Sequence, residues 1–202
     1  MINNSEIHCR RPIRLRQYDY SQTGAYFVTL CTQNRKILFG KIVDGEMVMN
    51  EGGHIAQQCW LDIPNHYPNA ELDNFIVMPN HVHGIIIIKD EIVGAIHELP
   101  LRNTKMIRRK MLLPRIIGYF KMNTSKQINQ IRKTPGIPVW QRNYYDHIIR
   151  NQDELNRIRE YIINNPLQWE YDRENTHRIP NKASPWQTLE DIIYGKAEKQ
   201  HP

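Results

Sequence analysis

The sequence predicts an α+β fold in which helices pack against an antiparallel sheet. Along the 202 residues, β-branched runs, a tight hairpin signal and helical spacings follow one another in irregular order. Hairpin-joined strands interspersed with a few helices are typical of an antiparallel sheet rather than a parallel one. Hydrophobic residues make up 40% of the chain, and the mean hydropathy is −0.63, which together predict a soluble protein with a packed core.

Turn residues divide the first half of the chain into strands and one helix. Asp44-Gly45 is a strong two-residue hairpin signal, and Gly52-Gly53 is interpreted as the end of that hairpin. Apolar residues then recur at helical spacing as far as Pro64. The elements predicted in this half are a strand at 25–32, a hairpin at 37–49, a helix at 55–63 and a buried strand at 75–88.

The second half begins with a polar, basic stretch from Asp90 to Pro114, which predicts a long loop. Pro166 cannot continue a helix, so it ends the last helical pattern. The remainder of the chain is expected to wrap over the domain. The elements predicted here are a helix at 116–128, a short strand at 139–141 and a helix at 153–165.

Two histidines lie one residue apart in the apolar run 75–88. Because strand side chains alternate between faces, His81 and His83 point the same way while Val82 points into the core. Two neighbouring imidazoles on one face are well placed to share a divalent metal. The alternative is a pair of half-exposed, hydrogen-bonded histidines.

The charge and the cysteine content of the chain indicate the kind of binding partner and the cellular compartment. Lys and Arg outnumber Asp and Glu by 27 to 21, and the pI is about 9.2, which favours a polyanionic partner. Three cysteines without Cys-x-x-Cys spacing predict neither disulfides nor a thiolate zinc site, so a reducing cytoplasm fits best. The start of the chain does not look like a secretory signal, and no apolar stretch reaches membrane length.

Three motifs occur in order along the chain: Met-Pro-Asn-His-Val-His-Gly at 78–84, Val-Trp-Gln-Arg-Asn-Tyr-Tyr-Asp-His-Ile-Ile-Arg at 139–150, and Tyr-Ile-Ile-Asn-Asn-Pro at 161–166. Together with the segment around Gly24-Ala25-Tyr26-Phe27-Val28-Thr29, they resemble the REP-associated tyrosine transposases, a branch of the single-tyrosine HUH transposases. The resemblance spans roughly residues 10 to 170. A His-x-His pair is weak evidence alone, but three ordered motifs are strongly specific.

The resemblance implies a ferredoxin-like α/β sandwich and a single transposase domain over residues 1–202, with its core at about 20–170. It implies an enzyme that cleaves and rejoins single-stranded DNA near hairpins of the REP type through a 5′-phosphotyrosine. Tyr161 would be the nucleophile, and His81, His83 and Asn165 would hold a divalent metal ion, Mg²⁺ or Mn²⁺. The protein would act as a monomer or a homodimer.

Basic residues are the predicted contacts to DNA phosphates. Stacking on unpaired bases is a further expectation for Trp140, Tyr144 and Tyr145, with a core anchor as the alternative for Trp140. Tyr144 and Tyr145 are also the rival nucleophiles, because they stand next to Asp146 and His147. The predicted phosphate contacts are Arg10, Arg11, Arg14, Arg16, Lys105, Arg108, Arg109, Lys110, Arg142 and Arg150.

Two other classes of protein stay open at this point. One is a non-catalytic protein that binds hairpin DNA with the same fold. The other is a metal hydrolase acting on small molecules, which would need further ligands such as His54, His66 and Asp73.

Overall fold

The computed structural model describes residues 19, 21–89, 111–178 and 186–194, and it centres on a four-stranded sheet. The strand order is β4-β5-β1-β6, and every neighbouring pair is antiparallel. The sheet strands are β1 (Gly24–Cys31), β4 (Ala70–Val77), β5 (His81–Ile88) and β6 (Tyr145–Ile149).

Helices connect these strands in the pattern β-α-β-β-α-β, with a small hairpin inserted after the first strand. Strand order and connectivity together are those of a ferredoxin-like sandwich, which confirms the predicted fold class. The remaining elements are η1 (Gln33–Arg35), β2 (Gly40–Val43), β3 (Glu46–Met49), α1 (Glu51–Leu61), α2 (Ile63–His66), α4 (Leu112–Ile131), α5 (Gln152–Asn164), η2 (Pro166–Tyr171) and α6 (Gln187–Tyr194).

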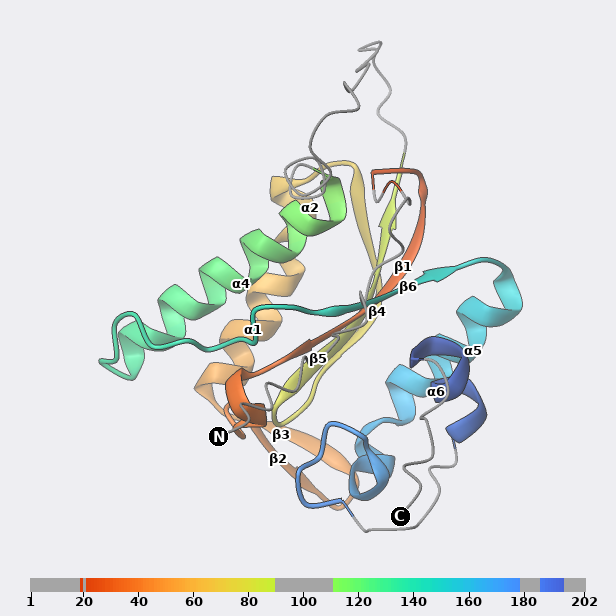
Figure 1. Ribbon diagram of the computed structural model, residues 1–202. Helices are drawn as coiled ribbons and strands as arrows, with labels where there is room; N and C mark the ends of the chain where they lie inside the picture. Colours follow the sequence, from red (N-terminus) through yellow and green to blue (C-terminus); the bar gives the residue numbers. More distant parts are fainter. Residues whose placement is uncertain (1–18, 20, 90–110, 179–185, 195–202) are drawn as a thin grey trace, which may run out of the picture.

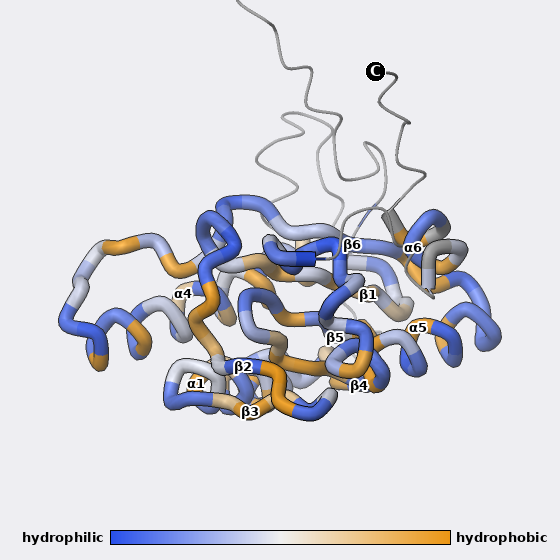
Figure 2. Tube along the Cα trace, turned by 90° about the horizontal axis from the view of Figure 1, so that it is seen from below, coloured by the Kyte–Doolittle hydropathy of each residue, from blue (hydrophilic) through white to orange (hydrophobic). Residues whose placement is uncertain are grey.

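Both faces of the sheet are covered (Figure 1). Helices α1 and α4 lie on one side of the strands, and α5 and α6 lie on the other. Figure 2, which looks from below, shows the same arrangement, with β5 between the two helical layers. A strand covered on both faces can carry apolar residues at every position, and this accounts for the unbroken Ile85–Ile88 run of β5.

Alternation along β5 divides the core in two. Val82 and Ile86 belong to the cluster that contains Trp60 of α1, whereas Ile85 belongs to the cluster that contains Ile158 of α5. The predicted direction of Val82 is therefore confirmed. The opposite face, which carries the histidines, is a second buried layer under α5.

The predicted single strand at 75–88 is wrong, because a turn divides it. β4 ends at Val77, and β5 begins at His81. Pro79 has no amide hydrogen to give to a strand partner, and its carbonyl instead accepts from the amides of Leu38 and Phe39 at 2.9 and 3.1 Å. The turn is closed by the Met78 amide, which donates to the His81 carbonyl at 2.8 Å.

Gly52-Gly53 does not end the hairpin but lies in the first turn of α1. Asn50 caps this helix, since its side chain accepts from the Gly53 amide at 3.0 Å. The added cap starts the helix four residues earlier than the apolar spacing predicts. Pro64 lies at the start of α2, where proline is tolerated.

The predicted strand at 139–141 is also wrong, because only an isolated bridge joins Trp140 to Thr32. The strand that completes the sheet is β6, a few residues further on. Its two buried polar residues, Asp146 and His147, obscure the apolar pattern that identifies a strand.

Several other expectations agree with the structure. The first strand, the hairpin and the helices at α4 and α5 are confirmed, with ends shifted by a few residues. Of the predicted loop at 90–114, residues 90–110 lie outside the described residues, and α4 already begins at Leu112. In the tail, α6 buries Leu189 and Ile193 against the core under α5.

Within the described ranges, none of the helices combines the length and the apolar character needed to cross a membrane.

Gly84 is expected to be indispensable for packing of the sheet against α1. A Cβ at this position would lie 2.2 Å from Cζ2 of Trp60, a fully buried ring. Gly84→Ala should therefore lower the free energy of unfolding by about 2–3 kcal/mol or more, measured by chemical denaturation. Gly118→Ala is the matched control, because, apart from the backbone of its own helix and its chain neighbours, no described atom would lie within 4 Å of the added Cβ. In a helix that change should be neutral or stabilising by up to about 1 kcal/mol, and equal losses in both variants would contradict the packing argument.

Candidate metal centre and tyrosine site

His81 and His83 stand side by side on the face of β5 that α5 covers. Both side chains are fully buried, so the alternative of half-exposed histidines is wrong. Their ring centroids are 4.4 Å apart. Burying two imidazoles is costly unless their nitrogens have hydrogen-bond or metal partners. The contacts of each nitrogen therefore show which of them is available to bind a metal.

The Nδ1 atom of each ring is held by a neighbouring polar side chain. His81 Nδ1 is 2.8 Å from the amide oxygen of Asn80, which only accepts, so this nitrogen carries the hydrogen and Nε2 carries the lone pair. His83 Nδ1 is 2.9 Å from the Thr29 hydroxyl. Metal-binding histidines commonly use one nitrogen for the metal and fix the ring through the other.

Asp172, which follows η2, brings a carboxylate to the free side of His81. Its Oδ2 is 3.8 Å from His81 Nε2, which is too long for a hydrogen bond. Neither of these two buried atoms has a hydrogen-bond partner within the described part of the chain. His81, His83 and Asp172 offer ligand atoms that all lie within 4.8 Å of one another, the arrangement of a site for one metal ion.

Two buried groups hold Asp172 in this position. Its Oδ1 accepts from the Glu174 amide at 2.6 Å, so only Oδ2 faces the histidines. Asn80 in turn donates its Nδ2 to the Glu174 carbonyl at 2.8 Å. Asn80 thus ties the His81 ring to the segment that carries Asp172.

Tyr161 of α5 completes the cluster. Its ring is 1% exposed, and its hydroxyl is 3.5 Å from His83 Nε2. The hydroxyl therefore lies next to the nitrogen that a shared metal would use.

A cap at the start of α5 and polar contacts to two strands fix this helix on the sheet. The Asn151 side chain caps the first turn by accepting from the Glu154 amide at 2.9 Å, and Glu154 Oε1 is 2.8 Å from His147 Nε2 on β6. Further along, Arg159 donates to both carboxylate oxygens of Asp73 on β4, at 2.8 and 2.5 Å. Such two-pronged contacts set the rotation of the helix and hence the direction of Tyr161.

Asn165 ends α5 one turn after Tyr161, still in a right-handed helical conformation despite the proline that follows. It is buried, and its Oδ1 has no hydrogen-bond partner among the described residues. This orphaned acceptor is consistent with the predicted role of Asn165 as a ligand.

Burial determines the charge of the two histidines. It lowers the pKa of His83 well below the usual value, an effect that the neighbouring His81 increases, and it also lowers the pKa of His81. Both rings are therefore neutral at pH 7, the form in which imidazole binds a metal.

The metal-free protein should lose stability as the pH falls below about 6.5, where histidines of the unfolded chain take up protons. The folded state resists protonation because the pKa values of His81 and His83 are depressed, so the unfolded state binds more protons across this window. Urea denaturation between pH 7 and pH 5 measures the loss. In His83→Gln the loss should be smaller, since one of the two groups is gone; an unchanged loss would show that His83 titrates normally.

The rival tyrosines have less suitable surroundings. Tyr144 belongs to the core cluster that contains Trp60, on the other side of the sheet from the histidines. Thr29 on β1 is paired with Tyr145 on one side and with His83 on the other. Because paired residues of neighbouring strands point to the same face of a sheet, Tyr145 lies on the face that carries the histidines. Burial, together with the charge of Asp146, raises the pKa of Tyr145 to about 12, which disfavours the phenolate.

Trp140 is a core anchor. It is buried, and its Nε1 donates to the Thr124 hydroxyl at 2.8 Å. The expectation that this ring stacks on DNA bases is therefore wrong for the structure described.

Two of the predicted phosphate contacts, Arg142 and Arg150, are exposed and lie at opposite ends of the edge strand β6. The structure does not bring them together. The other predicted contacts lie outside the described residues: Arg10, Arg11, Arg14, Arg16, Lys105, Arg108, Arg109 and Lys110.

The extra ligands that a small-molecule hydrolase would need are engaged or placed elsewhere. His54 is an exposed residue of α1, His66 stacks on Tyr119 at 4.1 Å, and Asp73 is paired with Arg159.

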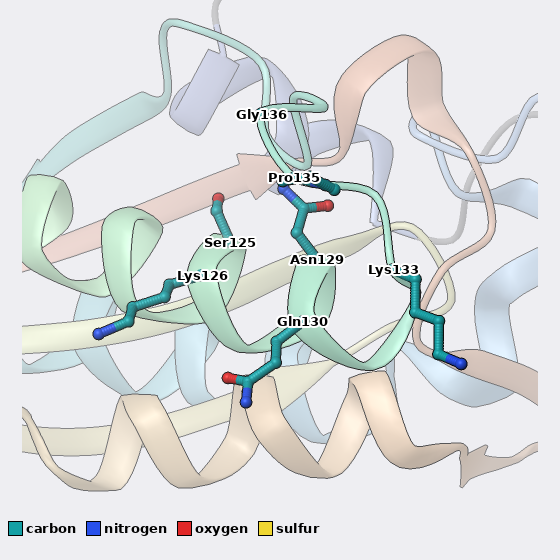
Figure 3. A pocket seen from close by; sticks show the side chains of 7 residues that line it. All are labelled: Ser125, Lys126, Asn129, Gln130, Lys133, Pro135 and Gly136. Atoms are coloured by element: carbon teal, nitrogen blue, oxygen red, sulfur yellow. The ribbon is translucent and has the colours of Figure 1, made fainter.

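A separate hollow of about 430 Å³ lies at the end of α4 (Figure 3). Its two lysines, Lys126 and Lys133, extend away from each other. Asn129 is engaged by the Ile137 carbonyl and the Thr134 hydroxyl, at 2.7 and 3.1 Å. The hollow thus offers no converging polar groups and shares no residue with the histidine cluster.

The residue that sequence reasoning missed is Asp172. It lies eleven residues after Tyr161, beyond the last motif, in a segment where several acidic residues are equally plausible. The acidic residues of this short stretch are a weak signal for a further metal ligand, because no spacing rule identifies which of them reaches the histidines. Thr29 and Asn80, which hold the histidine rings, lie within matched motifs, yet their roles depend on contacts across the sheet.

A ferredoxin-like sheet that carries a buried His-x-His pair beside a helix-borne tyrosine is the architecture implied by the resemblance to the single-tyrosine transposases. Sequence comparison matches an uncharacterized protein of Haemophilus influenzae at 41% identity over 174 residues, which is 84% of this chain and 95% of that protein. It also matches a H. influenzae protein provisionally named a REP-associated tyrosine transposase, at 25% identity over 76% of each chain.

The chain belongs to the same family as the first of these proteins, and its resemblance to the REP-associated tyrosine transposases is confirmed. No family model matches the chain. Among solved structures, a REP-associated tyrosine transposase bound to a REP hairpin matches 77% of this chain and 73% of its own, with a TM-score of 0.46 and 17% identity. A provisionally assigned transposase from Deinococcus radiodurans matches 75% of this chain and 95% of its own, with a TM-score of 0.40 and 17% identity.

Proposed function

We propose that this chain is a metal-dependent transposase that cleaves and rejoins single-stranded DNA near hairpins of the REP type through a 5′-phosphotyrosine on Tyr161. The observation that carries the proposal is the position of the Tyr161 hydroxyl, 3.5 Å from the Nε2 atom of His83 in a buried, metal-suited cluster. A nucleophile next to the group that neutralises the phosphate is the basic requirement of phosphoryl transfer.

The residues present fit a divalent metal. His81 Nε2 and Asp172 Oδ2 are buried acceptors without hydrogen-bond partners in the described chain, a costly state that a shared cation would relieve. Two imidazoles and one carboxylate are a common donor set for Mn²⁺ and neighbouring transition metals, and Mg²⁺ also accepts the carboxylate. Asn165, through its orphaned Oδ1, is the further candidate ligand. When bound, the metal would polarise a phosphoryl oxygen and offset the negative charge that develops on the phosphate.

The chain itself supplies the nucleophile and its alignment. The Tyr161 oxygen would form a bond to phosphorus, the bond from phosphorus to the 3′ oxygen would break, and the DNA end would leave as a 3′-hydroxyl. Overall, the proton lost by the phenol equals the proton gained by the leaving 3′ oxygen, so the step is balanced. A later attack by a DNA 3′-hydroxyl on the phosphotyrosine would reverse these bonds, so joining needs no added energy source.

Because Tyr161, His81, His83 and Asp172 come together within a single chain, we propose that they act within one subunit. The net charge of +6 favours a polyanionic substrate. The basic residues outside the described ranges stay the predicted phosphate contacts, with Arg142 and Arg150 at the two ends of β6.

Incubation with end-labelled hairpin DNA carrying single-stranded flanks, in the presence of Mn²⁺ or Mg²⁺, tests this function by denaturing gel electrophoresis. We expect a protein–DNA adduct that a chelator abolishes and that added metal restores. If a broad panel of hairpins is bound but never cleaved, the chain is a non-catalytic hairpin-binding protein. An adduct that forms equally in the chelator would overturn the metal-dependent mechanism.

A further inference from the structure

Two arginines from distant parts of the sequence meet on one buried carboxylate beside the metal centre. Arg35 Nε donates to Glu174 Oε2 at 2.8 Å, and Arg173 Nε lies 3.3 Å from Glu174 Oε1. The Glu174 side chain is 7% exposed, whereas the side chains of Arg35 and Arg173 are 44% and 38% exposed. A buried acid thus holds two guanidinium groups at the surface.

This pair is connected directly to the ligands. Asn80 accepts from the His81 ring, and its Nδ2 donates to the backbone carbonyls of both Arg35 and Glu174, at 3.2 and 2.8 Å. The backbone of Arg35 and that of Glu174 are therefore both tied to the side chain that holds the His81 ring.

The backbone at Arg35 is held in an unfavourable conformation. Asn34 and Arg35 have φ angles of 56° and 52°, in the left-handed region that residues other than glycine seldom adopt. The Thr32 hydroxyl fixes this turn by donating to the Lys36 carbonyl at 2.7 Å. Strain of this kind persists only where the surrounding structure compensates for it, and the side chain that this turn carries is the one that donates to Glu174.

We propose that Arg35 and Arg173, positioned by Glu174, form an arginine clamp that binds a phosphate of the single-stranded DNA next to the metal centre. This inference rests on the proposed function, because it assumes DNA as the ligand of this face. Within the described chain, the Arg35 side chain forms only the hydrogen bond through Nε, so its terminal Nη groups can donate to a phosphate in the two-pronged manner typical of arginine. The clamp lies outside every basic cluster predicted from the sequence.

Fluorescence anisotropy with labelled hairpin DNA that carries single-stranded flanks tests the clamp without cleavage. The measurement uses Tyr161→Phe protein in a chelator, at salt concentrations from about 50 to about 200 mM. We expect Arg35→Gln and Arg173→Gln each to weaken binding roughly 10-fold. Each should also reduce the slope of log affinity against log salt by about 0.7, the value for one phosphate contact with a single strand.

Arg132→Gln is the matched control, since Arg132 is exposed at the end of α4, on the other face of the sheet. If Arg35→Gln and Arg173→Gln change the slope no more than this control does, the clamp is refuted. Thermal unfolding checks each variant, and Arg173→Gln decides alone if Arg35→Gln does not fold. If the arginine variants lower the salt slope but the unmutated protein forms no covalent adduct, the clamp is supported and the transposase proposal is refuted. If the unmutated protein forms adducts but the arginine variants leave the salt slope unchanged, the transposase proposal is supported and the clamp is refuted.

Discussion

Tyr161→Phe is expected to abolish the covalent adduct with hairpin DNA. The substitution removes one oxygen and leaves the ring, which packs on Phe27 and His83, in place. Loss of a catalytic nucleophile generally lowers the rate by roughly 10⁴-fold or more. Denaturing gel electrophoresis over a time course measures the remaining rate, while anisotropy should show unchanged DNA binding.

Tyr145→Phe is the matched control for this experiment. Tyr145 lies on the same face of the sheet as the histidines, but its raised pKa of about 12 disfavours it as a nucleophile. We expect its adduct yield to stay within a few-fold of the unmutated protein. If Tyr145→Phe loses the adduct while Tyr161→Phe keeps it, the assignment of the nucleophile is reversed.

Asp172→Asn is expected to weaken binding of Mn²⁺ by roughly 100-fold or more, because it removes the one negative charge of the donor set. The amide keeps the size of the side chain and the oxygen that accepts from the Glu174 amide, so the fold should be preserved. Isothermal titration calorimetry of the metal-free protein measures the affinity directly. The free energy of unfolding without metal should stay the same or rise, because Oδ2 of this buried carboxylate has no hydrogen-bond partner among the described residues.

Asn165→Ala separates the two candidates for the third ligand. If the carboxylate is the principal ligand, this variant should lower the metal affinity less than Asp172→Asn does, by about 10-fold at most. The converse order, with Asn165→Ala more severe, would make the amide oxygen the third ligand and would leave Asp172 as a neighbour of the site.

The sequence identified the parts of this molecule that local patterns encode. The alternation of β5 placed His81 and His83 on one face, and the helical pattern before Pro166 placed Tyr161 and Asn165 one turn apart. Errors arose where a tertiary contact overrides a local pattern. The apolar run at 75–88 reads as one strand, but the Pro79 carbonyl accepts amides from a distant segment and the chain turns there.

Two further errors, at β6 and at the first turn of α1, have causes that lie closer in the sequence. Asp146 and His147 are polar yet buried, and Glu154 of α5 supplies the partner that makes burial of His147 tolerable. Glu154 lies outside the strand, on α5, so the alternation along β6 does not contain that information. Similarly, Gly52 and Gly53 look like a break until Asn50 is seen to cap the helix that contains them.

By itself, the sequence determined the fold class, the histidine pair, the tyrosine and the resemblance to one family of transposases, because these depend on periodicity and on short ordered motifs. Only the tertiary structure decided that Asp172 joins the histidines and that Arg35 and Arg173 share one carboxylate. Arg35 and Arg173 lie far apart in the chain, and spacing carries no signal across such distances. Their partnership arises because the antiparallel sheet and the turn at Asn80 bring the end of β1 and the segment after η2 to the same edge of the buried site.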